Sequence, residues 1–364
     1  MICQFCVMDT TAEGIQFDEL GRCNFCQTYL NKYSENPDRS HELTQFLKEI
    51  KAAGKRKKYD CIVGLSGGVD SSYTLHLVKS FGLRPLAVHM DNGWNSEIAT
   101  NNIHNLVRKL DVDLYTHVID WEEYKDLMNS FFMANVIDIE LLYDNAMLAV
   151  NYAQANKYGI KYILSGSNSA TEGMPMPNAW NWNKFDVKNI KAIHGKYGKI
   201  KINTLPTLNT FQYVYYRVIK KIKWVYFLDY LVYEKEKAID LLKESYLFKP
   251  YPYKHYESVF TRFYQGYILP RKFNVDKRLV HFSTLICSGQ MTREAALNDL
   301  KKSPYASEAA LREDRAYFLK KMNWSDQKLE DYLTSPPNDH SSFASEKKNL
   351  DAIRSFYKKL KSYQ

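Results

Sequence analysis

The amino-acid sequence predicts an α/β fold, in which a doubly wound parallel sheet follows a cysteine-rich segment and precedes a mainly helical region. Three observations support this prediction. Short apolar runs alternate with helical patterns from residue 59 to about residue 170, which is typical of parallel sheets. Two Cys-x-x-Cys pairs fall within the first 26 residues. After residue 210 the apolar spacing is mostly helical.

Length and composition exclude several classes of protein. The chain has 364 residues and a net charge of +9, with 25% charged and 14% aromatic residues. This length predicts two or three domains, and this composition argues against disordered, collagen-like and coiled-coil chains. No apolar run approaches the roughly 20 residues of a membrane helix. Because no basic stretch followed by an apolar run opens the chain, we expect a cytoplasmic protein.

The alternating region predicts four strands and the helices between them. The expected strands cover residues 61–65, 85–90, 114–119 and 161–165. The expected helices cover residues 72–81, 98–110 and 138–158. The stretch that follows, residues 171–210, reads as a long functional loop. We therefore divide the chain into a cysteine segment (1–40), an α/β domain (41–205), a helical substrate or partner region (206–300) and a helical tail (301–364).

The first predicted strand is followed by the glycine-rich sequence Ser66-Gly67-Gly68-Val69-Asp70-Ser71-Ser72. The glycines let the backbone turn tightly and approach a ligand. Backbone N–H groups at the start of the following helix would then face an anion such as phosphate, with the three serine hydroxyls as further donors. Asp70 is suited to hold Mg²⁺ or to cap the helix. The loop is neither a Walker A motif nor a dinucleotide fingerprint.

Polar residues also follow two other predicted strands. Asp91 ends the second strand, and Gly166-Ser167-Asn168 follows the fourth. Because ligands bind beyond the carboxyl ends of parallel strands, these residues are candidates for contacts to a nucleotide. Glu172 is a candidate ligand for Mg²⁺. An ordinary polar loop is an equally good interpretation of each residue taken alone.

The spacing of four cysteines predicts a metal site. Cys3 and Cys6 form one pair, Cys23 and Cys26 form a second, and 16 residues separate the pairs, as in a zinc ribbon with four thiolates. Such a Zn²⁺ would be structural, because thiolates close all four positions. Unliganded cysteines and an iron–sulfur cluster are the alternatives. The other two, Cys61 and Cys287, are interpreted as core residues.

A cluster of titratable residues lies in the helical region. Lys254, His255 and Arg262 could bind an anionic sugar nucleotide or pyrophosphate, and Glu257 could orient a base. We predict catalytic roles for these four residues together with Asp70. A solvated helix face is the alternative interpretation. Arg293, further along, is a candidate substrate contact.

Most of the positive charge lies in one segment. Residues 184–230 contain ten basic and two acidic residues, so they carry 10 − 2 = +8 of the net charge. Just before this segment, Trp180 and Trp182 could stack on sugar or uridine rings. The stretch 211–233 mixes aromatic and basic residues, which fits a docking surface, a membrane surface or an amphipathic helix.

The glycine-rich loop resembles the pyrophosphate (PP) loop of the ATP pyrophosphatases, the group that includes asparagine, NAD and GMP synthetases. That resemblance implies an adenine nucleotide α-hydrolase-like fold. The loop, the cysteine pairs, Lys254-His255-Tyr256-Glu257-Ser258 and the run from Ile286 to Glu294 together resemble the N-acetyl sugar amidotransferases of bacterial surface-polysaccharide pathways. The resemblance covers roughly residues 1–300. Ser167 departs from the pattern, because NAD synthetases have an acidic residue there.

The resemblance implies an ATP-dependent carbon–nitrogen ligase that uses ATP and Mg²⁺. ATP would adenylate the acetamido oxygen of a nucleotide-linked N-acetyl sugar, which we expect to be UDP-linked, and ammonia would displace AMP. The product would be an acetamidino sugar for lipopolysaccharide O-antigen or capsule. The implied ammonia source is a separate glutaminase with a cyclase-like channel subunit, a pair that resembles imidazole-glycerol-phosphate synthase. The implied ATP contacts are Ser66, Gly67, Gly68, Asp70, Ser71, Ser72, Asp91, Gly166, Ser167 and Asn168, with Mg²⁺ at Asp70 and Glu172.

Two other functions compete with this one. A tRNA-thiolating enzyme also combines a PP-loop with zinc ribbons, but it predicts basic charge spread along an RNA path and further paired cysteines. A zinc-ribbon interaction module with a degenerate ATP fold is the non-enzymatic alternative, and the intact loop argues against it. We therefore expect no nucleic-acid partner.

Overall fold

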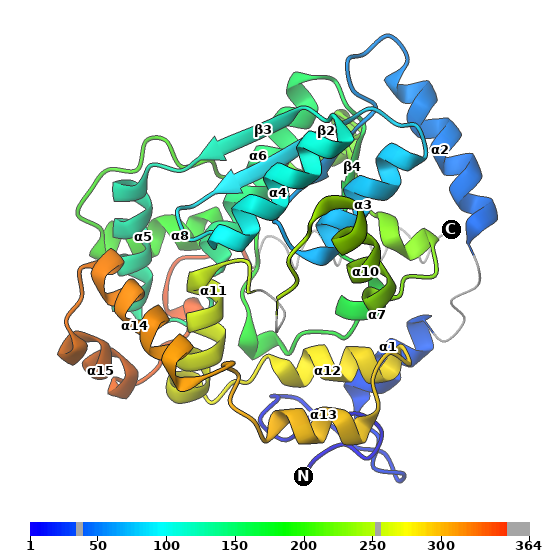
Figure 1. Cartoon of the computed structure of the whole chain (residues 1–364). Coiled ribbons are helices and arrows are strands. Elements are labelled where there is room, and N and C mark those ends of the chain that lie inside the picture. The colour runs from blue at the N-terminus through cyan, green and yellow to red at the C-terminus, as the bar shows by residue number, and fades with distance from the viewer. Residues whose placement is uncertain (34–38, 252–255, 348–364) are drawn as a thin grey trace, which may run out of the picture.

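A parallel sheet lies at the centre of the fold. The computed structural model describes residues 1–33, 39–251 and 256–347 (Figure 1). The five strands have the order β3-β2-β1-β4-β5, and each neighbouring pair is parallel. This arrangement, with helices on both faces, confirms the predicted fold class. The strands are β1 Cys61–Gly64, β2 Pro85–Asp91, β3 Leu114–Val118, β4 Tyr162–Ser165 and β5 Lys223–Tyr226.

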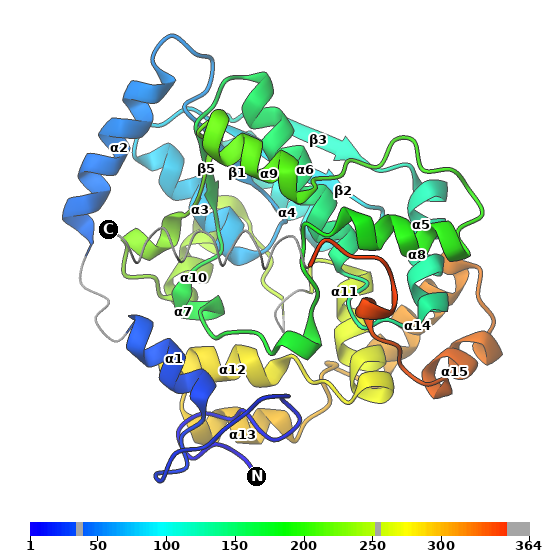
Figure 2. The ribbon, with the colours of Figure 1, turned by 180° about the vertical axis from the view of Figure 1, so that it is seen from behind.

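Helices cover both faces of the sheet, because successive strand residues point to opposite sides. In β1, Val63 joins the apolar core under α3 (Val69–Ser80) and α4 (Glu97–Leu110). Its neighbour Ile62 joins the core under α6 (Leu141–Lys157). Figures 1 and 2 show these two layers from opposite sides.

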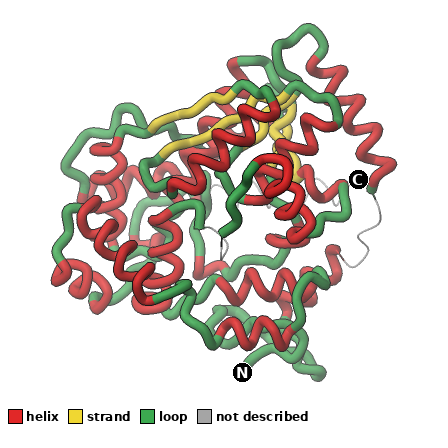
Figure 3. Tube along the Cα trace, in the orientation of Figure 1, coloured by secondary structure: helices red, strands yellow, loops and turns green. Residues whose placement is uncertain are grey.

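The helical C-terminal region packs against one end of the α/β layers. Figure 3 shows the strands gathered in one part of the molecule and helices with loops in the rest. The helices of this C-terminal region share one apolar core with the sheet and the N-terminal cysteines. The division into four domains stays a prediction. The remaining helices are α1 Asn24–Tyr33, α2 Ser40–Gly54, α5 Trp121–Ala134, α7 Ser169–Glu172, α8 Val187–Tyr197, α9 Thr210–Val214, α10 Lys235–Tyr246, α11 Val259–Phe263, α12 Arg278–Cys287, α13 Arg293–Leu300, α14 Glu308–Met322 and α15 Asp326–Thr334, with π-helical turns over Tyr215–Ile219 and Tyr264–Phe273.

Three elements differ from the sequence-based expectations. Helix α5 was not predicted, although Asp120 caps it by accepting a hydrogen bond from the Glu123 N–H at 3.0 Å. Helix α8 lies inside the stretch expected to be a loop, and Asp186 caps it in the same way. Strand β5 lies in the stretch 211–233, which was expected to form a docking surface, a membrane surface or an amphipathic helix. An edge strand of four residues that begins with a lysine gives only a weak period-two pattern.

The cysteine segment packs against the C-terminal helices rather than the sheet. It lies beside α12 and α13 in both views of the ribbon (Figures 1 and 2). The Val7 N–H donates to Ser283 Oγ on α12 at 3.2 Å. None of the described helices is both long and apolar enough to cross a membrane.

Candidate active site and metal centre

The glycine-rich loop connects the end of β1 to the start of α3. Gly67 has φ +85°, and a Cβ there would lie 2.8 Å from the Ala99 carbonyl oxygen, so glycine is required. Ser66 Oγ accepts from the Gly68 N–H at 3.2 Å, and Ser71 Oγ accepts from the Ser66 N–H at 3.2 Å. These bonds hold the loop in shape while the N-terminus of α3 faces a cavity.

This nucleotide-sized cavity, of about 300 Å³, lies at the carboxyl ends of β1, β2 and β4. Its wall includes Ser66, Gly68, Asp70 and Ser71 of the loop, with Gly166, Ser167, Glu172 and Glu257. A Cβ on Gly166 would lie 2.6 Å from the Ser71 backbone nitrogen, so β4 ends in direct contact with the loop. The structure therefore brings most of the predicted ATP contacts to one cavity.

Four predicted ATP contacts do not line this wall, namely Gly67, whose close approach to Ala99 is described above, and three polar residues. Ser72 is fully buried behind the loop. Asn168 Oδ1 accepts from the Thr171 N–H at 2.9 Å, so this side chain caps α7. Asp91 Oδ1 accepts from the Gly93 N–H at 2.8 Å and from Asn95 Nδ2 at 3.1 Å. These side chains shape the loops around the cavity, and their contact with ATP stays a prediction.

Two carboxylates in the wall are suited to a hard cation. Asp70 stands in the first turn of α3, and Glu172 ends α7. The Tyr233 hydroxyl donates a hydrogen bond to Asp70 Oδ1. Burial, and next the Asp70 charge, raise the pKa of Tyr233, so the phenol keeps the proton that it donates. Oxygen ligands from two elements fit Mg²⁺, which is usually held by one or two carboxylates together with substrate phosphates.

The C-terminal region contributes Glu257 to the same wall. The Glu257 carbonyl accepts from the Ser96 N–H at 2.8 Å, and the Val259 N–H donates to the Trp94 carbonyl at 2.8 Å. A Cβ on Gly68 would lie 3.4 Å from Glu257 Oε1, so this carboxylate faces the loop. Lys254 and His255, also predicted here, lie outside the described residues.

A second cavity, of about 410 Å³, adjoins the first and shares Thr171, Glu172 and His281 with it. Methionine, valine and phenylalanine side chains form part of its wall, and three cations reach it. Arg262 is one of them, and its guanidinium is paired with Asp314. The structure therefore places Arg262 one cavity away from the loop. The other wall cations are Lys277 and Arg278.

A third cavity, of about 260 Å³, shares Ser66, Tyr143, Asp144 and Glu257 with the first. A charge cluster contributes two partly exposed residues, Lys184 and Asp144, to its wall, and a third member, Asp138, is buried behind them. Lys184 Nζ is 2.8 Å from Asp138 Oδ2 and 2.9 Å from Asp144 Oδ2.

Asp138 of this cluster is 1% exposed. Burial would raise the pKa of Asp138, but the ammonium groups of Lys184 and Lys277 outweigh burial and lower it. Sequence reasoning missed the cluster, because its members are distant in the chain and match no motif.

The three predicted substrate contacts have structural roles instead. Trp180 is 2% exposed and lies in the core. The Trp182 ring stacks on His340 with centroids 4.9 Å apart, and its Nε1 donates to Asp186 at 2.9 Å. Arg293 donates to the carbonyl oxygens of Cys3 and Cys6, with its Nη2 2.8 Å from the first. Tryptophans packed in this way do not offer a face to a sugar, and Arg293 braces the cysteine segment.

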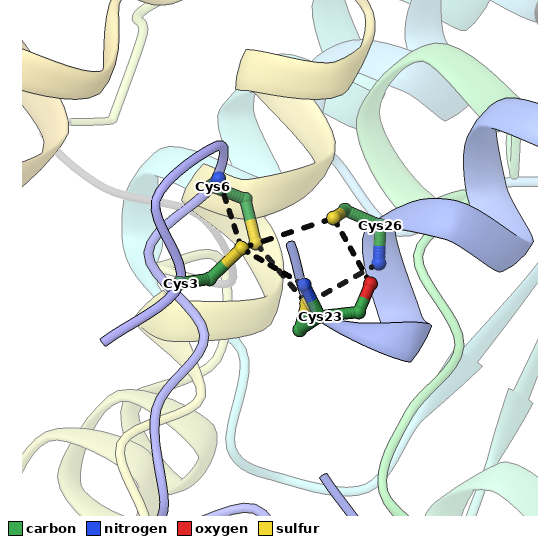
Figure 4. A group of neighbouring side chains, drawn as sticks. All are labelled: Cys3, Cys6, Cys23 and Cys26. Carbon is green, nitrogen blue, oxygen red and sulfur yellow. Dashed lines mark hydrogen bonds between the residues drawn. The ribbon is translucent and has the colours of Figure 1, made fainter. Parts of the chain in front are cut away.

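The four N-terminal cysteines converge on one point (Figure 4). All are fully buried, and their Sγ atoms lie within 4.8 Å of one another. Sγ of Cys6 and Cys23 are 3.5 Å apart, and those of Cys3 and Cys26 are 3.8 Å apart. A tetrahedron with metal–sulfur bonds of about 2.3 Å has edges of roughly 3.8 Å. The arrangement therefore fits a single four-coordinate ion.

Two family models match separate parts of the chain. Residues 40–174 match the NAD synthase family model. Residues 257–361 match the model described as the C-terminal domain of WbpG-like LPS biosynthesis proteins. The chain thus carries an NAD synthase-type PP-loop domain and a WbpG-like C-terminal domain, which agrees with the predicted resemblance to PP-loop amidotransferases of LPS biosynthesis. A search of curated proteins gives no match.

The solved structures that resemble this chain include three proteins whose names describe different activities. NMN synthetase from Francisella tularensis is 17% identical, over 57% of this chain and 85% of its own, with a TM-score of 0.31. The NH3-dependent NAD synthetase from Campylobacter jejuni is 15% identical, over 43% and 71%, with a TM-score of 0.30. The U34-tRNA thiolase NcsA from Methanococcus maripaludis is 11% identical, over 87% and 88%, with a TM-score of 0.32.

Proposed function

We propose, from the joining of an NAD synthase-type PP-loop domain to a WbpG-like C-terminal domain, that this chain is an ATP-dependent amidotransferase. It adenylates the acetamido oxygen of a nucleotide-linked N-acetyl sugar, and ammonia then displaces AMP. The product is an acetamidino sugar for lipopolysaccharide or a related glycan.

One observation carries the proposal. The cavity at the PP-loop is walled by residues of both matched segments, since Ser66 and Asp70 come from the first and Glu257 is the first residue of the second. The C-terminal domain therefore reaches the place where the nucleotide phosphates would bind. A sugar-specific domain that meets a PP-loop at one cavity is suited to activating a sugar with ATP.

The adjoining cavities provide room for both substrates. In our proposal the loop N–H groups and the α3 N-terminus hold the ATP phosphates, and Asp70 and Glu172 hold Mg²⁺, which would neutralise charge on those phosphates. The sugar nucleotide lies in the second cavity, which shares Glu172 and His281 with the first. This placement directs the acetamido oxygen at the α-phosphate.

The reaction then proceeds in two steps. The acetamido oxygen attacks the α-phosphorus, and the bond to the β-phosphate breaks with loss of pyrophosphate. Ammonia adds to the activated carbon, the carbon–oxygen bond to AMP breaks, and one proton is released. Glu257, whose carboxylate faces the loop, is positioned to accept that proton, with Lys254 and His255 as the other predicted catalytic groups. We infer that ammonia comes from a glutaminase subunit through a cyclase-like channel subunit.

Pyrophosphate release tests the proposal. Purified protein is incubated with ATP, Mg²⁺, ammonium chloride and one member of a panel of UDP-N-acetyl sugars. We expect release of pyrophosphate and AMP that depends on both sugar and ammonium. Release with unmodified tRNA and not with any sugar would instead identify the thiolating alternative, and no release with any substrate would favour the interaction module.

A single substitution tests the site. Asp70→Asn is expected to abolish pyrophosphate release and to leave the metal content of the cysteine site unchanged. Asp240→Asn, on the exposed side of α10, is the matched control and should keep full release. Activity that persists in Asp70→Asn would remove this carboxylate from the mechanism.

A further inference from the structure

A helix on the outer surface presents an apolar stripe to solvent. Helix α9 and the π-helical turn after it form one continuous helix over residues 210–219. Side chains spaced by four, seven and eight residues share one face of such a helix. The exposed fractions on this face are 67% for Phe211, 45% for Tyr215, 50% for Val218 and 67% for Ile219. We call these four residues the apolar stripe.

The stripe is not the face that packs on the protein. The opposite face of the helix packs inward, where the Tyr213 ring stacks on Phe185 at 4.3 Å and the Tyr216 ring stacks on Tyr152 at 5.5 Å. The helix therefore has two apolar faces. One packs against the core, and the other, the apolar stripe, is exposed. A contiguous exposed apolar face of this kind marks an interaction surface.

Cations border the stripe. Arg217, Lys221 and Lys223 are exposed beside it, and Lys220 is partly exposed. The sequence between Asp186 and Asp229 contains no acidic residue. Glu346, from elsewhere in the chain, places one carboxylate at the start of the helix, where it accepts from the Thr210 N–H at 3.3 Å. The four cations outnumber this acid, so the surface complements an anionic partner. The chain's own residues 348–364 do not fit that charge, because they contain five basic residues and one acidic residue and so carry 5 − 1 = +4.

The stripe lies away from the three cavities. Lys161, which precedes β4, donates to the Lys220 carbonyl at 2.6 Å, and the Lys223 N–H donates to the Lys161 carbonyl at 2.8 Å. The helix thus ends at the amino edge of the sheet, whereas the cavities lie at the carboxyl ends of the strands. Figure 2 shows α9 beside α6 and far from α7 and α12.

We propose that the apolar stripe and its cations form a docking surface for an anionic lipid membrane. Phe211, Val218 and Ile219 would enter the boundary between headgroups and acyl chains, while the bordering cations contact lipid phosphates. A convex helix with aromatic and aliphatic side chains on one side and Lys and Arg beside them is the type of element that lies in this interface. The contact is peripheral, and it does not depend on the proposed enzymatic function.

Vesicle co-sedimentation of the full chain tests the surface. We expect binding to vesicles of equal parts phosphatidylglycerol and phosphatidylcholine, weak binding to pure phosphatidylcholine, and release as salt rises. The triple variant Phe211→Gln, Val218→Gln, Ile219→Gln should bind the anionic vesicles at least tenfold more weakly. The variant Arg217→Gln, Lys221→Gln, Lys223→Gln should lose about fivefold per cation, or about a hundredfold in all.

Controls separate the stripe from general hydrophobicity and misfolding. The double variant Leu20→Gln, Met133→Gln replaces two apolar side chains that are 69% and 52% exposed elsewhere, and it should bind vesicles like the unmodified chain. Circular dichroism and the thermal midpoint should be unchanged in all variants, because every replaced side chain is exposed. No binding to anionic vesicles, equal binding to both lipid mixtures, or binding that the stripe variant retains would overturn the proposal. The first result would assign the surface to a protein partner.

Discussion

The cysteine segment and the parallel sheet are held together by different physical means. In residues 1–33 the centre consists of four convergent sulfur atoms, which fit one metal ion. In the sheet, alternate side chains of each strand enter apolar cores on its two faces. Metal binding should therefore determine the stability of the cysteine segment, whereas burial and close backbone packing should determine the stability of the sheet.

The largest expected effect is the loss of metal and of stability in the cysteine segment when one thiolate is removed. Cys6→Ser is expected to reduce the metal content from about one zinc per chain to nearly none, and to destabilise the segment by several kcal/mol, because metal binding supplies its folding energy. Metal analysis and absorption spectroscopy measure this. Cys287→Ser, outside the cluster, should keep the metal. An iron–sulfur absorption spectrum would contradict the structural-zinc interpretation.

A single methyl group added at the end of β4 should impair the glycine-rich loop and leave the metal site of the cysteine segment intact. In Gly166→Ala the new Cβ would lie 2.6 Å from the Ser71 backbone nitrogen, so β4 and the loop must move apart. We expect pyrophosphate release to fall about 100-fold, the cost of a displacement near 1 Å, with unchanged metal content.

Gly195→Ala is the matched control for this substitution. It adds a methyl group with no atom within 4 Å inside α8, and it should raise stability by up to about 1 kcal/mol. Release that stays near normal in Gly166→Ala would show that the loop tolerates the movement.

The contact between the cysteine segment and helix α13 should have a smaller effect. Arg293→Gln removes the hydrogen bonds to the Cys3 and Cys6 carbonyl oxygens, so we expect the free energy of unfolding to fall by about 2 kcal/mol. Denaturant unfolding measures this, and the exposed Arg312→Gln should have no effect. Sugar-dependent release should be retained, because Arg293 contacts the cysteine segment and lines none of the three cavities. A loss of release with normal stability would restore its predicted role as a substrate contact.

Acid should destabilise the cysteine segment and the rest of the chain through the titration of different groups. Acid releases metal from the first by protonating thiolates. Near the C-terminus, burial lowers the pKa of His340, which stacks on Trp182, to about 4. An unfolded histidine binds its proton near pH 6.5, so His340 stabilises the fold above that pH, and the stabilisation is lost as pH falls towards 4. The expected loss is about 3 kcal/mol.

The unfolding free energy at several pH values measures this titration. His340→Asn should flatten the dependence between pH 4 and 6.5, whereas His41→Asn, on the exposed side of α2, should leave it unchanged. An unchanged slope in His340→Asn would assign the acid sensitivity to other groups.

The sequence predicted the sheet well because buried parallel strands appear as short apolar runs, and four of the five strands were placed. Strand β5 was missed because it is an edge strand of only four residues that begins with a lysine. The glycine-rich loop and the cysteine pairs were readable because each is a local pattern with fixed spacing. Trp180, Trp182 and Arg293 were misjudged because a residue type that can bind a substrate can equally pack a core or brace a backbone.

The charge cluster could not be predicted, because no local pattern in the sequence marks it. Asp138, Asp144 and Lys184 come from segments that give no common motif, and only the packing of α6 against the chain near residue 184 brings them together. The adjoining cavities depend on the same long-range packing, since Glu257 joins the loop from 190 residues away.

The brace from Arg293 to the cysteine segment also has a consequence for the order of folding in the cell. The carbonyls of Cys3 and Cys6 are synthesised almost 290 residues before the guanidinium that binds them. At roughly 5–20 residues per second, the nascent segment waits on the order of tens of seconds for that partner. Early metal capture would protect its thiols during this interval, so the supply of metal during translation, and not only the final stability, should determine the yield of folded chain.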